Sequence, residues 1–258
     1  MSLSTHRRGW LQAGLASAGA LVLGACDKIT ANPRAVAVLQ SAEGLTRRAQ
    51  RLAVNRKALA REFGHADISP DFRPNGSTDP TDDDYVALKT KGFADYRLVI
   101  DGLVEKPLSL SLADLRAQAA RTQITRHDCV EGWSSIAKWT GARLGPLLDQ
   151  AGLKKAARYV VFHCGDTLEQ TLDGTGQYYE SIDLIDAYHP QTILAYAMND
   201  RVLPVAHGAP LRLRVERQLG YKQAKYIMRI EVVDDYAHLG RGNGGFWEDR
   251  GYEWYAGI

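Results

Sequence analysis

The spacing of apolar and polar positions changes along the chain. Between Arg34 and Phe63, apolar positions such as Leu45, Leu52 and Leu59 recur every seven residues among Ala, Gln, Arg and Glu. This spacing is typical of one face of an amphipathic helix. We expect this helix to lead from the N-terminal segment to the globular body and to pack one face on it.

From Tyr96 onward, short apolar runs alternate with turn residues, which predicts strands. Ser111 is placed to cap the first of two short helices, and Asn199-Asp200 predicts a hairpin turn. Strands mixed with short helices indicate an α+β fold. The predicted strands are YRLVIDGLV, TQITRHDC, RYVVFHC, TILAYAM, PLRLRVE and YIMRIEVVD, and the predicted helices are SLADLRAQA and RLGPLLDQAGL.

Composition and charge change this picture little. The chain has 258 residues, of which 45% are hydrophobic and 24% charged, and its formal net charge is +2. A sizeable core is therefore expected. The near-neutral balance gives no sign of nucleic-acid binding.

The N-terminus predicts export. Arg7 and Arg8 precede an apolar run, Leu11 to Leu23, that is too short to span a bilayer as a mature helix. The paired arginines followed by Gly-Trp-Leu resemble a twin-arginine signal. The run ends in LGAC, which resembles a lipoprotein cleavage box with Cys26 as the acylated residue. Plain secretion, with cleavage near Ala25, is the alternative.

Cys129 stands where a predicted strand ends, in RHDCVEGW. A thiolate there suits a nucleophile, one half of a disulfide with Cys164, or a soft metal ligand. A nucleophile needs a base, and His127, on the same strand face, is a weak candidate. A metal needs further ligands, and no Cys or His cluster supplies them. A metal at Cys129 therefore requires a cofactor with ligands of its own, which indicates molybdenum on a pterin dithiolene.

A basic cluster occupies His207 to Lys225, HGAPLRLRVERQLGYKQAK. Arg212 and Arg214 share a strand face, so we expect them to converge on one anion. Arginine forks bind phosphate in a bidentate manner, lysine adds a point charge, and glycine lets the backbone approach closely. A solvated basic edge strand explains the same pattern equally well.

Three stretches together resemble the molybdopterin domain of the sulfite oxidase family. They are HDCVEGWSSIAKWTG, HPQTILAYAMNDRVLPVAHGAPLRLRVERQLGYKQAKYI and the closing GYEW. The resemblance is to the exported bacterial branch, which contains periplasmic methionine-sulfoxide reductases, and it extends over approximately Phe72 to Ile258. It implies a mixed α+β molybdopterin-binding fold.

The resemblance also implies roles for single residues. Cys129 corresponds to the thiolate ligand of molybdenum. His207 and Arg212 correspond to contacts with the pterin and its phosphate. Lys225 completes the phosphate pocket with the backbone before it, and we add Lys222 to this set.

Two further assignments rest on the same resemblance. FRPNG resembles the first cofactor-contacting loop, so Asn75 is expected to touch the pterin and Arg73 to face the oxo ligands or an anionic substrate. Cys164 falls where the reductase branch has a threonine near the pterin, so it would line the pocket as a small buried residue. A disulfide between Cys129 and Cys164 would then be an apo form and not the working state.

The implied activity is two-electron oxygen-atom transfer on a small sulfur substrate, by sulfite oxidation or sulfoxide reduction, with a molybdenum-molybdopterin cofactor. A haem-attachment CxxCH is missing from the sequence, so we expect a separate electron carrier, a cytochrome or a quinol-linked haem protein. The rivals are a metal-free thiol hydrolase using Cys129 and His127, and a non-enzymatic lipid-anchored binding protein.

We therefore divide the chain into a signal segment (1–26), a helical spacer (27–65) and a molybdopterin-binding oxidoreductase domain (66–258). The expected location is the periplasm, with Cys26 holding the protein at the outer face of the inner membrane. The closing aromatic residues are expected to pack over the domain rather than to form a substrate funnel; they are Trp247, Tyr252, Trp254 and Tyr255.

Overall fold

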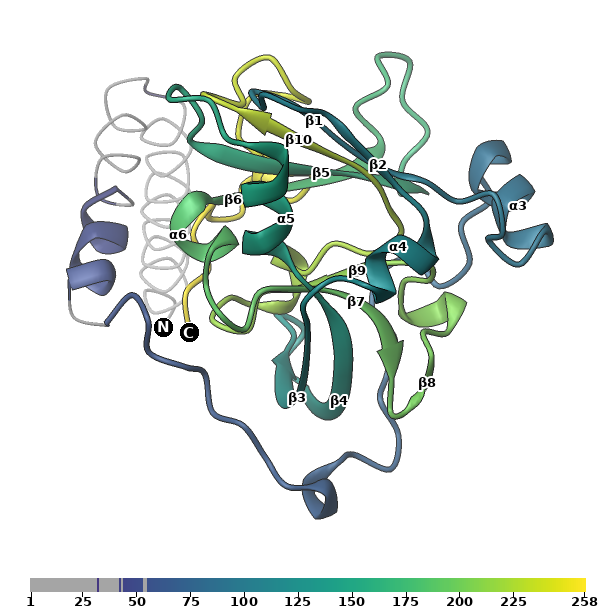
Figure 1. Ribbon diagram of the computed structural model, residues 1–258. Coiled ribbons are helices and arrows are strands. Elements are labelled where there is room, and N and C mark those ends of the chain that lie inside the picture. The colour runs from purple at the N-terminus through teal and green to yellow at the C-terminus, as the bar shows by residue number, and fades with distance from the viewer. Residues whose placement is uncertain (1–31, 33–41, 43, 53–54) are drawn as a thin grey trace, which may run out of the picture. The chain divides into compact units, whose positions relative to one another are not determined.

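The computed structural model describes residues 32, 42, 44–52 and 55–258 (Figure 1). The predicted signal with Arg7, Arg8 and Cys26 lies outside the described residues. The chain divides into two units, Met1–Val54 and Asn55–Ile258. In the first unit, residues 44–52 are helical, as expected. No helix within the described ranges is both long enough and apolar enough to cross a bilayer.

The predicted helix does not continue to Phe63. In the second unit, residues 58–64 are not helical. The N–H of Ala60 donates to the side chain of Gln191 at 2.7 Å, and the N–H of Phe63 donates to the carbonyl of Ile124 at 2.9 Å. These tertiary partners outweigh the helical spacing, because helix propensity is a weak preference. The limits 27–65 and 66–258 stay predictions.

Strands of the second unit form two sheets in the described part of the chain. The first sheet has the order β2-β1-β10-β5-β6. Its β1 and β10 are parallel and its other pairs are antiparallel. Its strands are β1 (Leu98–Gly102), β2 (Leu108–Leu110), β5 (Tyr159–Thr167), β6 (Gln177–Asp183) and β10 (Ile227–Val233).

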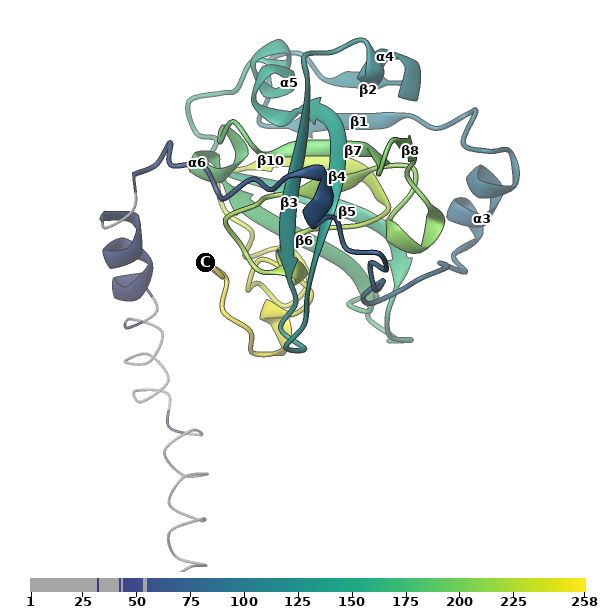
Figure 2. The ribbon, with the colours of Figure 1, turned by 90° about the horizontal axis from the view of Figure 1, so that it is seen from below.

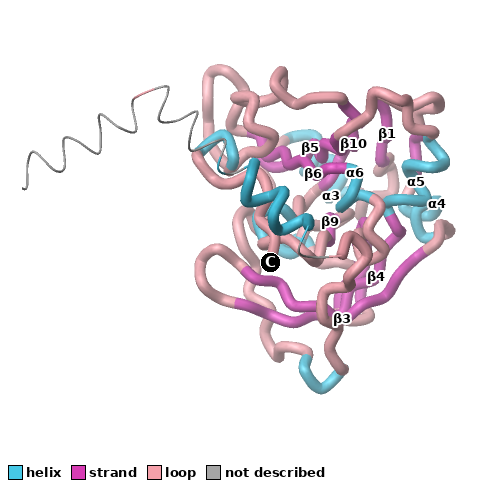
Figure 3. Tube along the Cα trace, turned by 90° about the vertical axis from the view of Figure 1, so that its left-hand side faces the viewer, coloured by secondary structure: helices cyan, strands magenta, loops and turns pink. Residues whose placement is uncertain are grey.

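The second sheet has the order β3-β4-β7-β8, with β9 also pairing with β7. The β3–β4 hairpin is in continuous antiparallel register from Ala120↔Ala142 to Asp128↔Ser134. Figure 3 shows it in a layer apart from β1, β5, β6 and β10. The strands are β3 (Ala120–Asp128), β4 (Ser134–Arg143), β7 (Ile193–Met198), β8 (Arg201–Val202) and β9 (Arg212–Arg214).

Short helices connect and flank the sheets, and the α+β prediction is confirmed (Figures 1 and 2). Ser111 caps α4 as expected, because its hydroxyl accepts from the N–H of Asp114 at 3.1 Å. The α-helices are α3 (Asp83–Thr90), α4 (Leu112–Arg116), α5 (Leu144–Ala151) and α6 (Leu184–Ala187), and the 3-10 turns are η1 (His65–Asp67), η2 (Val205–His207), η3 (Gly220–Lys222) and η4 (Glu248–Arg250).

The main hydrophobic core joins the two sheets. Ile100 and Phe162 of the first sheet belong to the same buried cluster as Leu194 and Leu213 of the second. Such burial contributes roughly 1.5–3 kcal/mol for each large apolar side chain. The core thereby fixes the ends of β3, β5 and β9 relative to one another.

An ion triad is buried beside this core. The Lys222 ammonium lies 2.5 Å from Glu180 of β6 and is also bound by Glu248 of η4, and all three side chains are fully or almost fully buried. Burial alone lowers the pKa of Lys222, but the two carboxylates outweigh it and raise this pKa. The triad joins η3 to a strand and to the C-terminal segment.

We expect Lys222→Ala to lower the free energy of unfolding by about 3–5 kcal/mol, because two carboxylates are left buried without their cation. Denaturant unfolding measures this change. Lys91→Ala is the control, since it breaks the exposed ion pair with Asp95 and should leave the unfolding midpoint unchanged. Equal stability of Lys222→Ala and the parent chain would contradict the structural role of the triad.

Candidate functional site

Cys129 lies at the first position after β3, as the sequence predicts. Its N–H donates to the carbonyl of Trp133 at 2.9 Å, and the N–H of Gly132 donates back to the Cys129 carbonyl at 3.0 Å. Gly132 has φ 84°, a conformation that glycine adopts without a steric penalty. This closed turn fixes the half-buried thiol at the end of the hairpin.

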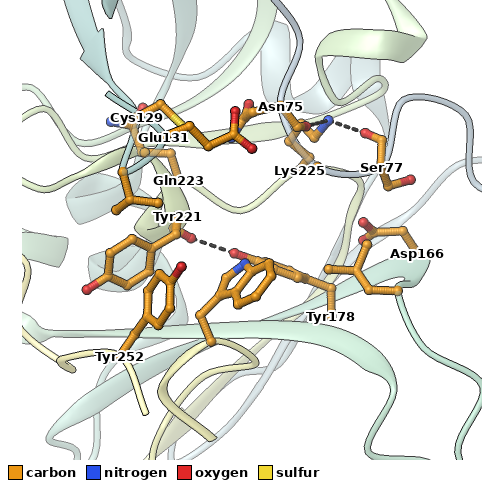
Figure 4. A pocket seen from close by; sticks show the side chains of 15 residues that line it. Asn75, Ser77, Cys129, Glu131, Asp166, Tyr178, Tyr221, Gln223, Lys225 and Tyr252 are labelled. Atoms are coloured by element: carbon orange, nitrogen blue, oxygen red, sulfur yellow. Dashed lines mark hydrogen bonds between the residues drawn. The ribbon is translucent and has the colours of Figure 1, made fainter. Parts of the chain in front are cut away.

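The thiol faces a cavity of about 130 Å³ (Figure 4). Its polar lining includes Asn75, Ser77, Asp166 and Lys225. Aromatic rings make another part of the wall. They belong to Tyr178, Tyr221, Trp247 and Tyr252.

Lys225 ties the loop that carries Asn75 to the rest of the site. Its ammonium donates to the carbonyls of Asn75 at 2.7 Å, of Ser77, and of Ala206 at 3.2 Å. Burial first and the nearby Arg212 second lower the pKa of Lys225 to about 7. Lys225 therefore loses its proton more readily than an ordinary lysine, and a neighbouring anion would stabilise its charged form.

Arg212 is fully buried without a carboxylate partner in the described chain. Its Nη1 donates to the carbonyl of His207 at 3.2 Å, while its Nε and Nη2 and the Nδ1 of His207 have no hydrogen-bond partner there. Burial, followed by Arg214, lowers the pKa of Arg212 to about 9. Burial, followed by Arg212, lowers the pKa of His207 to about 4. Unpaired buried donors of this kind favour an anionic ligand.

Gly208 allows these groups to meet. A Cβ at this position would lie 3.0 Å from the side chain of Lys225 and 3.3 Å from that of Arg212, and φ is 111°. A side chain at this position would therefore crowd the first carbons of both Lys225 and Arg212.

The structure does not bring Arg214 or Lys222 to the unpaired donors around Arg212. Arg214 is held by Glu216, with contacts of 2.9 and 2.6 Å, so the expected convergence of Arg212 and Arg214 on one anion is wrong. Lys222 belongs to the ion triad, in which the carboxylates of Glu180 and Glu248 compensate its charge. We leave Lys222 out of the proposed cofactor contacts for this reason.

His127 is not placed to activate the thiol. Its Nδ1 lies 3.2 Å from Nη1 of Arg214. A guanidinium only donates, so Nδ1 accepts and Nε2 carries the hydrogen. Burial, followed by Arg212, also lowers the pKa of His127 well below its usual value. Both ring nitrogens are thus unable to take a proton from Cys129, which argues against the thiol hydrolase.

Aromatic contacts hold the FRPNG loop against β3. The Phe72 ring lies 5.7 Å from His127 and 5.5 Å from His207, measured between centroids. Asn75, at the end of this loop, lines the cavity. Arg73 does not: it is exposed, and its guanidinium lies 5.9 Å from the Trp133 ring.

Cys164 is buried in β5 and does not line the cavity. It lies on a separate pocket with Tyr85 and Met228. Cys129 and Cys164 are both free thiols. The residue two positions along the strand, Asp166, lines the cavity instead.

Sequence reasoning missed several cavity residues. Trp247 and Tyr252 were expected only to pack over the domain, but they line the wall near Cys129. No spacing signal could place them, because both come from an irregular C-terminal segment. Asp166 could have been found, since it stands two residues after Cys164 on the same strand, and Glu131 stands two residues after Cys129 in the turn.

The comparison with known families shows which family the chain belongs to. The family described as oxidoreductase molybdopterin binding domain matches residues 86–239. The chain belongs to this family. Membership confirms the predicted molybdopterin-dependent oxidoreductase and its molybdopterin cofactor.

Three proteins illustrate the relationship. The putative protein-methionine-sulfoxide reductase subunit YedZ1 of Azospira oryzae is 40% identical over 64% of this chain and 56% of its own. The catalytic subunit MsrP of the Xanthomonas campestris protein-methionine-sulfoxide reductase is 37% identical over 61% of this chain and 50% of its own length. The crystal structure of the sulfane dehydrogenase SoxCD from Paracoccus pantotrophus matches 55% of this chain and 39% of its own chain, with 25% identity and a TM-score of 0.48. The chain spans about half the length of the curated relatives it matches.

The site chemistry fits the cofactor of this family. Molybdopterin combines a phosphate with a heterocycle that carries N–H donors. The unpaired donors of Arg212 suit the phosphate, and the unpaired acceptor oxygens of Asn75 and Gln223 suit the N–H groups. The unpaired atoms of Arg212, Asn75 and Gln223 thus have complementary groups on the cofactor.

We expect Cys129 to react slowly with iodoacetamide in cofactor-free protein at neutral pH. Burial, followed by the charge of Glu131, raises the pKa of this thiol above its ordinary value, so a smaller fraction is thiolate than for an ordinary cysteine at the same pH. Peptide mass spectrometry should show alkylation at Cys129 that accelerates with pH and is faster in Glu131→Gln. Cys164 should react only after unfolding. Reaction of Cys129 at pH 7 as fast as glutathione would contradict this environment.

Proposed function

We propose that the protein is a molybdenum-molybdopterin enzyme that reduces an organic sulfoxide to the thioether. The observation that carries the proposal is the aromatic wall in the cavity that holds Cys129. The balanced reaction takes two electrons and two protons, and it converts the sulfoxide to thioether and water. Sulfite oxidation, the other direction allowed by the sequence, fits this wall less well.

The wall suits an uncharged substrate with alkyl groups on sulfur. The ring of Tyr252 lies 5.2 Å from that of Tyr221 and 5.3 Å from that of Trp247, measured between centroids. Aromatic faces bind alkyl and sulfur groups favourably. A sulfite dianion needs converging cations, but the lining Lys225 already donates to backbone carbonyls. The names of the two reductase relatives support the same substrate class.

The chain's own residues divide the work of binding. The Cys129 thiolate holds the metal, Arg212 and His207 hold the phosphate, and Asn75 orients the heterocycle. When bound, molybdenum supplies the two-electron chemistry. Glu131 lines the cavity beside Cys129 and is itself fixed by the indole N–H of Trp133 at 2.9 Å.

The electrons come from outside this chain. We propose a periplasmic enzyme that receives them from a cytochrome or a quinol-linked haem protein. The twin-arginine-like signal supports this location, because that route carries proteins already folded around a cofactor. Acylation at Cys26 would keep the enzyme in the plane of its electron carrier.

Metal and substrate analysis tests the proposal. Protein exported by a pterin-competent host should contain close to one molybdenum per chain and should reduce methionine sulfoxide with a reduced viologen. Its kcat/KM for sulfite oxidation should be lower. Cys129→Ser should fold normally but lose about 100-fold or more of the activity, because an alkoxide is a harder ligand than a thiolate. A metal-free wild-type protein, or a preference for sulfite, overturns the proposal.

Arg212→Ala should lower the pterin content of the purified protein. The phosphate loses a charge-assisted hydrogen bond of about 1.5–3 kcal/mol, which corresponds to roughly 10–100-fold in affinity. Pterin fluorescence after oxidation measures the content per chain. Arg229→Ala, which breaks the half-exposed pair with Asp101, should leave it unchanged. Normal pterin in Arg212→Ala would exclude the phosphate role.

Cys26→Ala should release active, molybdenum-loaded protein into the soluble periplasm. A single lipid chain adds only marginal membrane binding, so the multiply acylated terminus is what holds this class of protein. Turnover with the artificial carrier should not change, since Cys26 is remote in sequence from every cavity residue. Fractionation of cells measures the release. If the wild-type protein is already soluble, the lipidation proposal is wrong and plain secretion explains the signal.

A further inference from the structure

The opening of the cavity lies between two segments that are far apart in the sequence. Leu168 begins the connection between β5 and β6, and Trp247 and Tyr252 lie on either side of η4. Tyr252 lines the cavity although it is 40% exposed, so it stands where the cavity meets solvent. Figure 4 shows its ring on the wall beside that of Tyr221. The spacing of the two segments therefore contributes to the width of the opening.

An ion pair joins these segments. Arg250, the last residue of η4, donates to both carboxylate oxygens of Glu169, from Nε at 3.0 Å and from Nη2 at 2.5 Å. Its Nη2 also donates, at 3.5 Å, to the carbonyl of Thr175, near the other end of the connection between β5 and β6. The guanidinium lowers the pKa of Glu169, so this carboxyl group is ionised at neutral pH. A bidentate arginine–carboxylate pair fixes geometry as well as charge.

The connection between β5 and β6 is closed by its own backbone. The N–H of Leu168 donates to the carbonyl of Gly176 at 2.9 Å, and the N–H of Gly176 donates to the hydroxyl of Thr171 at 2.9 Å. A Cβ on Gly176 would collide with the carbonyl of Glu169. The carboxylate of Glu169 and the cavity-lining Leu168 are therefore held in a fixed relation to each other.

Arg250 is tied equally closely to the rings on its side. Its Nη1 donates to the carbonyl of Phe246 at 2.8 Å, and its guanidinium lies 3.5 Å from the centroid of the Phe246 ring. The N–H groups of Arg250 and Tyr252 both donate to the carbonyl of Trp247, at 2.9 and 3.0 Å. A displacement of Arg250 therefore shifts Trp247 and Tyr252 with it.

We propose that the Glu169–Arg250 ion pair holds the two sides of the opening together and thereby makes the enzyme selective for small sulfoxides over bulky ones. The inference rests on the proposed function for its substrate class. Neither residue lines the cavity, so the pair positions the wall and is not catalytic. Contact attraction falls steeply when a gap opens between atoms. Separation of the two segments therefore weakens the hold on a small substrate and admits a larger one.

Steady-state kinetics of the molybdenum-loaded enzyme with two uncharged sulfoxides test the proposal. In Glu169→Ala and in Arg250→Ala, the KM for dimethyl sulfoxide should rise roughly three- to fivefold, with kcat close to the wild-type value. The KM for the bulkier methyl p-tolyl sulfoxide should stay the same or fall. The double variant should match either single variant, because each change already breaks the pair.

Salt and a conservative variant separate the ion pair from general packing. Sodium chloride should raise the KM for dimethyl sulfoxide in the wild type and not in Arg250→Ala, because the Glu169 side chain is 48% exposed and its charge can be screened. Arg250→Lys keeps the charge and loses the fork, so its KM should lie between those of the wild type and Arg250→Ala.

Arg229→Ala is the matched control, because it breaks another arginine–carboxylate pair, with Asp101, and neither of these residues lines the cavity. It should leave both KM values unchanged. An equal rise of both KM values in Arg250→Ala, or a fall in kcat with KM unchanged, makes the pair a structural contact and overturns the proposal. Wild-type values in Arg250→Ala overturn it as well.

Access to Cys129 gives a measurement that does not depend on turnover. In full-length protein without cofactor, Glu169→Ala should accelerate alkylation of Cys129 by the bulky N-(1-pyrenyl)maleimide more than by iodoacetamide, and Arg229→Ala should not. Equal acceleration of both reagents, or of neither, overturns the proposal. Molybdenum-loaded wild type that reduces neither sulfoxide refutes the proposed function, and access to the thiol then decides whether the pair controls the opening.

Discussion

The site depends on positive charge that the fold buries and does not neutralise. Arg212, in β9, forms no ion pair with any residue that the structure describes, although Arg214, two residues later, pairs with Glu216. The difference matters because an unpaired buried guanidinium costs free energy that only an anionic ligand recovers. Burial of apolar side chains in the core between the two sheets offsets the free-energy cost of this buried charge. Lys225, Gly208 and the loop at Asn75 are all arranged around the same charge.

Binding chemistry is distributed between the two sheets. In the second sheet, Cys129 directly follows β3 and Arg212 lies in β9, while Asp166, which lines the cavity, lies in β5 of the first sheet. In the aromatic wall, Tyr178 lies in β6 and Tyr221 in η3, while Trp247 and Tyr252 lie on either side of η4. The two sheets thus position the Cys129 thiol and the Arg212 guanidinium, and the segment around η4 adds two rings to the cavity wall. Loops on a rigid scaffold commonly have this role.

Local signals in the sequence predicted local features. The cap at Ser111, the hairpin turn at Asn199 and the strand end at Cys129 each depend on a few neighbouring residues, and each is found in the structure. The prediction of a helix up to Phe63 was wrong, because the backbone of Ala60 and Phe63 bonds to distant partners, Gln191 and Ile124 of β3. Lys222 was misjudged for the same reason: its carboxylates come from positions 42 and 26 residues away. Glu216 was a detectable exception, since it stands only two residues after Arg214.

The hairpin turn at Cys129 also has a consequence for biosynthesis. The ribosome makes this turn long before it makes Trp247 and Tyr252, so a nascent chain presents the thiol without the wall that later encloses it. The turn closes through its own backbone hydrogen bonds and can form early. During synthesis the turn at Cys129 therefore precedes the cavity, whose wall is complete only when the C-terminal segment with Trp247 and Tyr252 is in place.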